Sequence, residues 1–472
     1  MNRTLRCLAL LLLSATLFAQ QSAPTYPTPK GSPTVNGLAG FAKILCSAVF
    51  ISGRDDAEAA RDSAYFFMPA NEQNSVTWKV DRSEHIVTAS FGSESMSARQ
   101  YGDQGCIIQN RENPGIHFTP VPVKTTLPDA AGVDWPMGDR PGAPGLPAGV
   151  DRALLNQALD AAFGDAAALT QAFLVVYKGR IVAERYAPGV TKDTQLESWS
   201  MGKSITATLF ALLVKEGVYT IDQPAPVPVW QGQDDPRRLI RNRDLLQMSG
   251  GLKFVGNQEP GAPVTNTVLD HYYIYTGGID AFTYSITRPP EFPPGTDGRY
   301  RNCDPLTIGY LIKRAVEAKG EQYLTWPQRK LFDRIGIRRQ VLETDPYGNF
   351  LLTGYDYGTA RNWARLGLLY LHDGVWQGNR ILPEGWTTFV STLAPAWKTP
   401  VYGAFFWING DGNWHLPKDT YLAAGAGGQN TWIVPGRDLV IVRMGHMRGQ
   451  TVARRATNAA LDLVMRAIGA GR

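Results

Sequence analysis

Two pairs of short apolar runs, far apart in the chain, have the pattern of β-hairpins. Residues 172–177 and 180–186 are separated by a Lys-Gly turn, and residues 430–434 and 439–444 are separated by Pro-Gly-Arg-Asp. Apolar runs joined by such turns are typical of paired antiparallel strands. We therefore expect strands from both ends of one domain to form a single antiparallel sheet.

Helical patterns lie around and between these hairpins. Apolar residues recur there at intervals of three and four, which is the spacing of one face of a helix. The predicted helices are 151–163, 241–248, 306–319, 323–331, 359–373 and 452–468. This order predicts an α/β fold of the α+β type, in which an antiparallel sheet is flanked by helices and carries a mainly helical insert over residues 219–400.

The residues before this domain divide by composition. At 472 residues the chain is long enough for more than one domain. Residues 37–120 have the pattern of a small accessory domain, with a helix at 38–50 and strands at 76–80, 85–90 and 97–101. The predicted segments are a signal peptide at 1–19, a linker at 20–36, an N-terminal accessory domain at 37–120, a Pro-rich connection at 121–149 and a main domain at 150–472.

The first 19 residues have the features of a secretory signal. Arg3 and Arg6 precede an apolar run from Leu8 to Phe18, and Ala19 suits the position before a cleavage site. The run is too short to span a bilayer. We expect a secreted or periplasmic protein without a stable membrane span after signal cleavage, because no later segment looks long and apolar enough.

Charge and histidine spacing exclude several classes of function. The net charge of +5 becomes 5 − 2 = +3 without the two signal arginines, and the basic residues are not clustered. A nucleic-acid partner is therefore not expected. The six histidines show no metal-ligand spacing, so neither a metal nor another cofactor is expected.

Cysteine usage predicts one disulfide. Apart from Cys7 in the signal segment, the chain has Cys46, Cys106 and Cys303. An exported protein lies in an oxidising compartment. Cys46 and Cys106 both lie in apolar stretches of the accessory segment, so we predict that they pair and that Cys303 is a buried free thiol. Two buried free thiols in place of the bridge are the alternative.

The first candidate for chemistry is a Ser-x-x-Lys spacing at Ser200 and Lys203. It precedes an apolar helical run at residues 205–214. Positions three apart share a face of a helix, so Lys203 is expected beside the Ser200 hydroxyl in the first helical turn. A buried lysine loses part of its preference for the charged form and can accept a proton. The pattern alone is loose, and a chance occurrence is the alternative.

Two further motifs contain small or hydrogen-bonding residues. Tyr300 and Asn302 form a Tyr-x-Asn spacing, in which a phenol partly ionised by a nearby ammonium could act as a base and the amide could bind a substrate carbonyl. Gly425 and Ala426 lie in a small-residue loop before the strand at 430–434, where a backbone N–H could face an oxyanion. The alternatives are a packed tyrosine and an ordinary glycine loop.

These three motifs, in this order, resemble those of the serine β-lactamase and penicillin-binding-protein superfamily. The resemblance covers about residues 150–470 and is closest to class C β-lactamases, related esterases and 6-aminohexanoate-dimer hydrolases. It implies that Ser200 is the acylated nucleophile and that Lys203 and Tyr300 share the general-base and general-acid roles. It also implies that the N–H groups of Ser200 and Ala426 form an oxyanion hole.

One departure from the superfamily pattern bears on the substrate. Ala423-Ala424-Gly425 stands where relatives have Lys-Thr-Gly or His-x-Gly, so the cation that would pair with a substrate carboxylate is missing. The sequence therefore predicts a hydrolase for a small ester or amide. Arg301, Arg443 or His446 could supply the charge from another direction. The alternatives are a β-lactamase or D,D-peptidase, and a non-catalytic ligand binder of the penicillin-binding-protein type.

Overall fold

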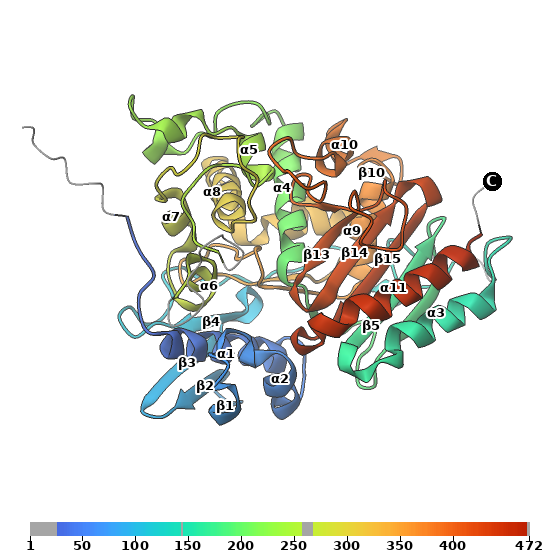
Figure 1. The fold of residues 1–472 in the computed structure, drawn as a ribbon, viewed down its shortest axis with the longest axis horizontal. Helices are drawn as coiled ribbons and strands as arrows, with labels where there is room; N and C mark the ends of the chain where they lie inside the picture. Colours follow the sequence, from blue (N-terminus) through green and yellow to red (C-terminus); the bar gives the residue numbers. More distant parts are fainter. Residues whose placement is uncertain (1–25, 143–144, 257–267, 470–472) are drawn as a thin grey trace, which may run out of the picture.

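A six-stranded antiparallel sheet holds both ends of the main domain together. The computed structural model describes residues 26–142, 145–256 and 268–469, and the predicted signal peptide lies outside them. The strand order is β12-β13-β14-β15-β5-β6 (Figure 1). The strands are β5 (Thr170–Tyr177), β6 (Arg180–Tyr186), β12 (Trp407–Ile408), β13 (Tyr421–Gly425), β14 (Gln429–Val434) and β15 (Leu439–Gly445). The predicted joining of the two hairpins in one sheet is confirmed, since β15 pairs with β5.

Alternating side chains of β15 explain why the sheet is covered on both faces. Leu439 and Ile441 belong to the core beneath helices α3 (Arg152–Gly164) and α11 (Gln450–Ala467). Val440 and Val442 belong to the larger core on the other face. Successive side chains of a strand point to opposite faces, so a strand that is apolar at every position must be covered twice. Figure 1 shows α3 and α11 side by side on one face of the sheet.

Helix α9 covers the second face at close range. It spans Ala360–Leu371, shorter at both ends than the predicted helix. A Cβ atom added at Gly367 would lie 2.6 Å from a methyl group of Val440. Because a side chain there would collide with the strand, glycine is needed for this helix to lie against the sheet.

The helical insert surrounds α4, which is buried through most of its length. The helices here are α4 (Gly202–Lys215), α5 (Asn242–Leu246), α6 (Asp270–Thr276), α7 (Ala281–Ile286), α8 (Cys303–Ala318) and α10 (Trp386–Ser391). The segment predicted as a helix at 323–331 is helical throughout but is not one regular α-helix. It has a 3-10 turn at Tyr323–Thr325, α-helical geometry at 326–327 and a π turn at Gln328–Phe332. Pro327 keeps helical backbone angles but has no N–H to donate to an earlier carbonyl.

The N-terminal unit, which we define as residues 33–109, packs a long helix on a four-stranded sheet. It contains α1 (Pro33–Phe50), α2 (Asp56–Asp62), β1 (Thr77–Asp81), β2 (Ile86–Phe91), β3 (Glu94–Gln100) and β4 (Cys106–Gln109), with strand order β1-β2-β3-β4. Helix α1 begins five residues before the predicted start. Pro33 is at its first position, and the hydroxyl of Ser32 accepts a hydrogen bond from the N–H of Val35. The predicted boundary between linker and accessory domain therefore falls inside this helix.

Helix α1 meets the length and composition of a membrane span. Among the described residues it is the helix that does so, and 78% of its apolar window is buried inside the fold. The expectation that no later segment would be long and apolar enough is thus wrong by this criterion. In the structure α1 serves as a core helix of the N-terminal unit.

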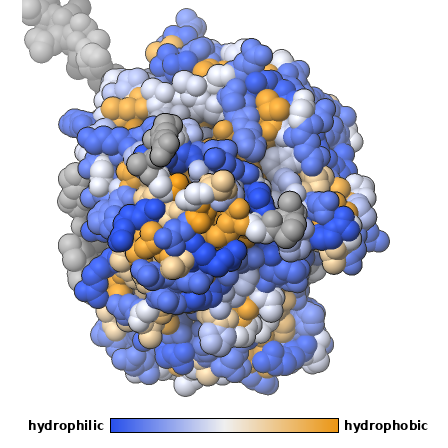
Figure 2. All heavy atoms as spheres, turned by 90° about the vertical axis from the view of Figure 1, so that its right-hand side faces the viewer, coloured by the Kyte–Doolittle hydropathy of each residue, from blue (hydrophilic) through white to orange (hydrophobic). Residues whose placement is uncertain are grey.

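The N-terminal unit shares one hydrophobic core with the helical insert. The same cluster contains Leu38 and Leu45 of α1 together with Leu209 and Phe210 of α4. The N-terminal unit is therefore continuous with the main domain in packing, although its sequence pattern sets it apart. Figure 2 shows the face at the right of Figure 1, where hydrophobic residues near its middle are bordered by hydrophilic ones.

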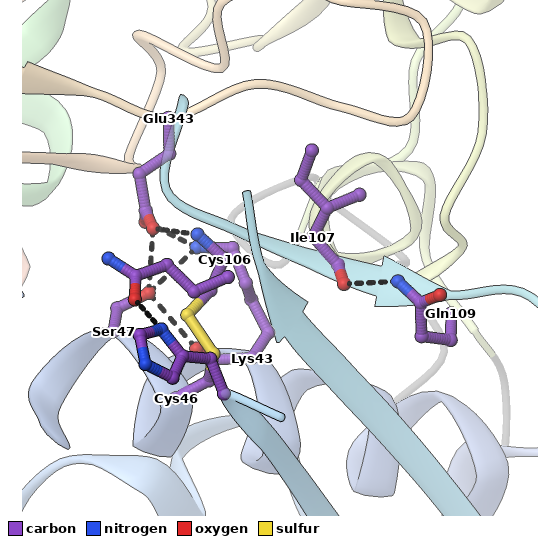
Figure 3. Close-up of a disulfide and its surroundings, with 9 residues drawn as sticks. Lys43, Cys46, Ser47, Cys106, Ile107, Gln109 and Glu343 are labelled. Carbon is purple, nitrogen blue, oxygen red and sulfur yellow. Dashed lines mark hydrogen bonds and ion pairs between the residues drawn. A yellow bond between two sulfur atoms is a disulfide. The ribbon is translucent and has the colours of Figure 1, made fainter. Parts of the chain in front are cut away.

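A buried ion pair and a disulfide fix this junction. Glu343 directly follows the short strand β8 (Val341–Leu342) of the insert. It forms an ion pair with Lys43 of α1, and both side chains are almost fully buried. The Glu343 carboxylate also accepts hydrogen bonds from the Ser47 hydroxyl at 2.8 Å and from the Cys106 N–H at 2.7 Å. A disulfide joins Cys106 to Cys46, next to this carboxylate (Figure 3). Buried charges are tolerated when they are paired and hydrogen-bonded in this way.

We expect the Cys46–Cys106 bridge to stabilise the fold. Removing it by the double substitution Cys46→Ala and Cys106→Ala should lower the free energy of unfolding by about 2–4 kcal/mol, because the unfolded chain gains freedom. Urea denaturation of the oxidised protein, with and without reductant, measures the change. The double variant is the control, since reductant should not alter its midpoint. Equal midpoints for the oxidised and reduced wild-type protein would contradict the prediction.

Candidate active site

Ser200 lies in a tight turn directly before helix α4. The chain passes from β7 (Leu196–Glu197) into a 3-10 turn at Trp199–Met201, and α4 begins at Gly202. The sequence predicts Ser200 in the first turn of the helix. It lies instead in the tighter 3-10 turn directly before the helix. The residue before it, Trp199, has a φ of 51°, which is rare for a bulky side chain. Packing must hold this conformation, and strained residues of this kind cluster at functional sites.

Lys203 and a backbone carbonyl hold the Ser200 hydroxyl. The Lys203 Nζ donates to Ser200 Oγ at 2.9 Å and to the Thr353 carbonyl at 2.7 Å. The Ser200 hydroxyl also contacts the Thr353 carbonyl at 3.1 Å. Sequence reasoning missed Thr353, because a main-chain oxygen in a loop leaves no signature in the side chains.

Burial sets the charge of Lys203. The side chain is 1% exposed, and desolvation lowers its pKa well below the usual value. The carboxyl of Asp356 opposes this shift, but burial raises the pKa of Asp356 well above its own usual value. Both groups are thus favoured in their neutral forms. A neutral amine beside a hydroxyl is a proton acceptor.

Tyr300 completes this group from the segment just before α8. The Lys203 Nζ lies 4.8 Å from the centre of the Tyr300 ring. Burial raises the pKa of Tyr300 well above its usual value, and a hydrogen bond with the Ser200 side chain opposes this only in part. The predicted partly ionised phenol is therefore corrected, since this partly buried phenol keeps its proton. Tyr300 suits a proton donor or relay, and Lys203 suits the base.

Contrary to the prediction, Asn302 does not face the cleft. It is fully buried, and its amide nitrogen lies 3.1 Å from the hydroxyl of Tyr275 and 3.3 Å from His271 Nδ1. Burial lowers the pKa of His271 to about 3, with Lys203 contributing to the shift, so the His271 ring is neutral. Asn302 thus holds the wall behind the site, and His271 itself lines the cleft.

The end of β13 lies against the turn that carries Ser200. A Cβ atom added at Gly425 would lie 2.3 Å from the Ser198 carbonyl and 3.0 Å from the Ser200 nitrogen. Only glycine allows this approach. Strand β12 pairs with no more than the first two residues of β13, so the end of β13 extends past it toward Ser200. Gly425 and Ala426 consequently line the same cleft as Ser200.

This cleft has a volume of about 400 Å³, and its lining combines large aromatic side chains with small and polar residues. Its walls include Phe66, Tyr272, Tyr300, Trp407, Trp414 and Met447. The sequence patterns did not reveal that these residues meet, because they come from the N-terminal unit, the helical insert and the sheet. Figure 1 places these three regions around α4.

The cation of the cleft is Arg454 of helix α11. Its side chain is exposed, lines the cleft and has no ion pair or hydrogen bond with any residue in the described ranges. The three candidates from the sequence lie elsewhere. Arg301 bonds to Glu291, Arg443 donates to the carbonyls of Gly427 and Gly428, and the His446 ring lies 3.5 Å from Glu58 and Glu197.

Cys303 has the surroundings of a structural side chain. Cys303 is buried, and desolvation raises the pKa of its thiol well above the usual value, which disfavours the reactive thiolate. Within residues 26–142, 145–256 and 268–469, no group of three or more His, Cys, Asp or Glu side chains is arranged to hold a metal ion.

The comparisons with known proteins agree on one family. The family model described as Beta-lactamase matches residues 155–465, so the chain belongs to the beta-lactamase family. The relatives and solved structures that it resembles include hydrolases. The 6-aminohexanoate-dimer hydrolase of Paenarthrobacter ureafaciens is 26% identical over 295 residues, which cover 58% of this chain and 72% of that protein.

Two solved structures show the same fold. A Bacillus anthracis protein described as a candidate 6-aminohexanoate-dimer hydrolase has a TM-score of 0.55 and 20% identity, covering 72% of this chain and 89% of its own. A penicillin-binding-protein homologue from Caulobacter crescentus has a TM-score of 0.52 and 15% identity, covering 68% of this chain and 99% of its own. The predicted fold class and family are confirmed.

The geometry predicts how the reactivity of Ser200 depends on Lys203. Covalent modification of Ser200 by a fluorophosphonate should slow by roughly a hundredfold or more in Lys203→Ala and in Tyr300→Phe. In the wild-type protein the labelling rate should rise with pH and then reach a plateau, because only the neutral amine accepts a proton. The midpoint of this rise should lie below the ordinary pKa of a lysine. Labelling rates measured by intact mass across pH test this expectation.

The matched control is Lys215→Ala, which removes an exposed lysine at the far end of the same helix. It should label at the wild-type rate. Unchanged labelling in Lys203→Ala, or a wild-type rate that falls as pH rises, would contradict the assignment of Lys203 as the base.

Proposed function

We propose that the protein is an exported serine hydrolase that cleaves an ester or amide through an acyl-enzyme on Ser200. The observation that carries this proposal is the 2.9 Å contact between Ser200 Oγ and the buried Lys203 amine, whose pKa is lowered. An activated serine needs an adjacent base. The similarity to a 6-aminohexanoate-dimer hydrolase supports hydrolysis of a small amide or ester.

The proposed acylation step moves one proton from Ser200 to the leaving group by way of Lys203 and Tyr300. Neutral Lys203 takes the hydroxyl proton as Ser200 Oγ bonds to the substrate carbonyl carbon. The N–H groups of Ser200 and Ala426 receive the developing oxyanion, a role for which backbone donors are suited. Tyr300 gives its proton to the departing amine or alcohol, and the Lys203 ammonium returns a proton to Tyr300.

Deacylation reverses these proton movements. A water molecule attacks the acyl carbonyl, its proton passes to the Lys203–Tyr300 pair, and Ser200 Oγ leaves with a proton returned from that pair. The products are a carboxylic acid and free enzyme. No step uses a metal or another cofactor.

Export is part of the proposal on two grounds. Residues 1–19 have the sequence features of a secretory signal. The Cys46–Cys106 disulfide is of the kind that persists outside the reducing cytosol. We therefore propose that the protein acts in the periplasm or outside the cell.

The electrostatics of the cleft bear on the substrate. The strand next to the nucleophile has no cation at Ala423, whose side chain is buried. Arg454 reaches the cleft from helix α11. A substrate carboxylate placed along β13 thus has no charged partner on that strand, while one directed toward α11 does. A linear neutral ester needs neither.

We expect a p-nitrophenyl ester to be hydrolysed with a higher kcat/KM than a chromogenic cephalosporin. A hydrogen bond to a charged group contributes about 1.5–3 kcal/mol, so the missing cation on β13 should weaken the cephalosporin by roughly ten- to a hundredfold. In Arg454→Gln the ratio of ester to cephalosporin turnover should rise further, because the remaining cation is lost. Steady-state kinetics on one preparation, with Ser200→Ala as the blank, provide the comparison.

The other outcomes point to the alternatives. A clear preference for the cephalosporin would favour a β-lactamase or D,D-peptidase. If no substrate is turned over and Ser200 is not labelled, the protein is a ligand binder without catalysis.

A further inference from the structure

The N-terminal unit contributes a side chain to the active-site cleft. Phe66 belongs to a 3-10 turn at Ala64–Phe67, and it lines the same cleft as Ser200. The family match begins at residue 155, so this wall comes from a part of the chain that the family model does not include. Packing alone does not require a half-buried phenylalanine to face the nucleophile.

The turn that carries Phe66 is anchored on both sides. A Cβ atom added at Gly40 of α1 would lie 2.5 Å from the Phe67 ring, so the helix and the turn are in close contact. The hydroxyl of Ser63 donates to Glu197 at 2.8 Å, three residues before the nucleophile. On the other side, Tyr65 stacks with Arg448, 4.8 Å from its ring centre. The position of Phe66 is therefore fixed relative to Ser200.

The ring contacts indicate which part of a substrate would meet Phe66. Its ring centre lies 5.1 Å from that of Trp199 and 6.2 Å from that of Tyr272. Tyr300, the proton donor for the leaving group, instead packs with Trp407 at 5.3 Å. A leaving group must lie beside Tyr300 to receive its proton. Phe66 and Tyr272 contact each other and belong to a different set of ring contacts from Tyr300 and Trp407, so we infer that the acyl group extends toward Phe66 and Tyr272.

We propose that Phe66 and Tyr272 form an aromatic wall for the acyl group, so that the N-terminal unit is a substrate-binding element that selects apolar, planar acyl groups. This inference rests on the proposed function. Aromatic pairs contribute beyond the area that they bury when rings lie 4.5–7 Å apart. A phenylacetyl group lying against the cleft-facing surfaces of these two rings would have such contacts, whereas an acetyl group would be too small to reach them.

The test compares two p-nitrophenyl esters that share a leaving group. In the wild-type protein kcat/KM for the phenylacetate should exceed that for the acetate. In Phe66→Ala this ratio should fall by roughly ten- to a hundredfold, within the range by which apolar pockets discriminate acyl groups. Phe66→Leu, which keeps most of the volume but no ring, should give an intermediate ratio and guards against a fold that does not tolerate alanine.

Phe50→Ala is the matched control. Phe50 is a half-buried phenylalanine of the same unit, but it stacks on His85 and does not line the cleft. It should leave the ratio unchanged. If Phe66→Ala slows both esters equally, Phe66 only supports the Trp199 turn, and the inference is wrong. If the wild-type protein shows no Ser200-dependent turnover of either ester, the proposed function itself fails.

Discussion

The hydrogen bond from a buried lysine to Ser200 is the interaction on which the rest of the site depends. A lysine costs several kcal/mol to bury in its charged form, and here it is 1% exposed with no carboxylate in direct contact among the described residues. The structure meets this cost by favouring the neutral amine and by giving it two oxygen partners. The same burial that destabilises the ammonium therefore creates a base.

The Thr353 carbonyl places this lysine, and the N-terminal unit holds the segment that carries Thr353. The N–H of Glu343 donates to the Tyr355 carbonyl at 3.0 Å, and the N–H of Leu351 donates to the Glu343 carbonyl at 2.9 Å. Glu343 in turn binds Lys43, Ser47 and the Cys106 N–H (Figure 3). Contacts of α1 and β4 are thereby connected through one loop to the nucleophile. This connection gives a physical reason for an N-terminal unit that shares its core with the main domain.

The sequence predicted the repeating parts of the fold and the local motifs. The two hairpins, α3, α8, α11 and the Cys46–Cys106 pair follow from periodicity, turn residues and composition. The pairing of Ser200 with Lys203 follows from their spacing of three. The segment at 323–331 is helical as predicted but changes from 3-10 to α to π geometry around Pro327, and the start of α1 was missed because a proline at the first helical position was taken as part of a linker.

What the sequence did not predict arises from contacts between distant segments. Thr353 acts through its backbone, Arg454 reaches the cleft only because α11 crosses the sheet, and Phe66 arrives from a unit with a different pattern. The charge states also needed the structure. From the sequence, a phenol next to an ammonium could be held partly ionised, but burial raises the pKa of Tyr300 and lowers that of Lys203.

The most direct test of this account is the mass of the protein trapped during turnover of a p-nitrophenyl ester. Rapid acid quenching followed by intact-mass and peptide analysis should find one acyl group, attached to Ser200 within the peptide that also holds Lys203. The adduct should be absent from Ser200→Ala. An acyl group on another residue, or an adduct of equal yield in Ser200→Ala, would contradict the central claim that Ser200, beside the buried lysine, is the acylated nucleophile.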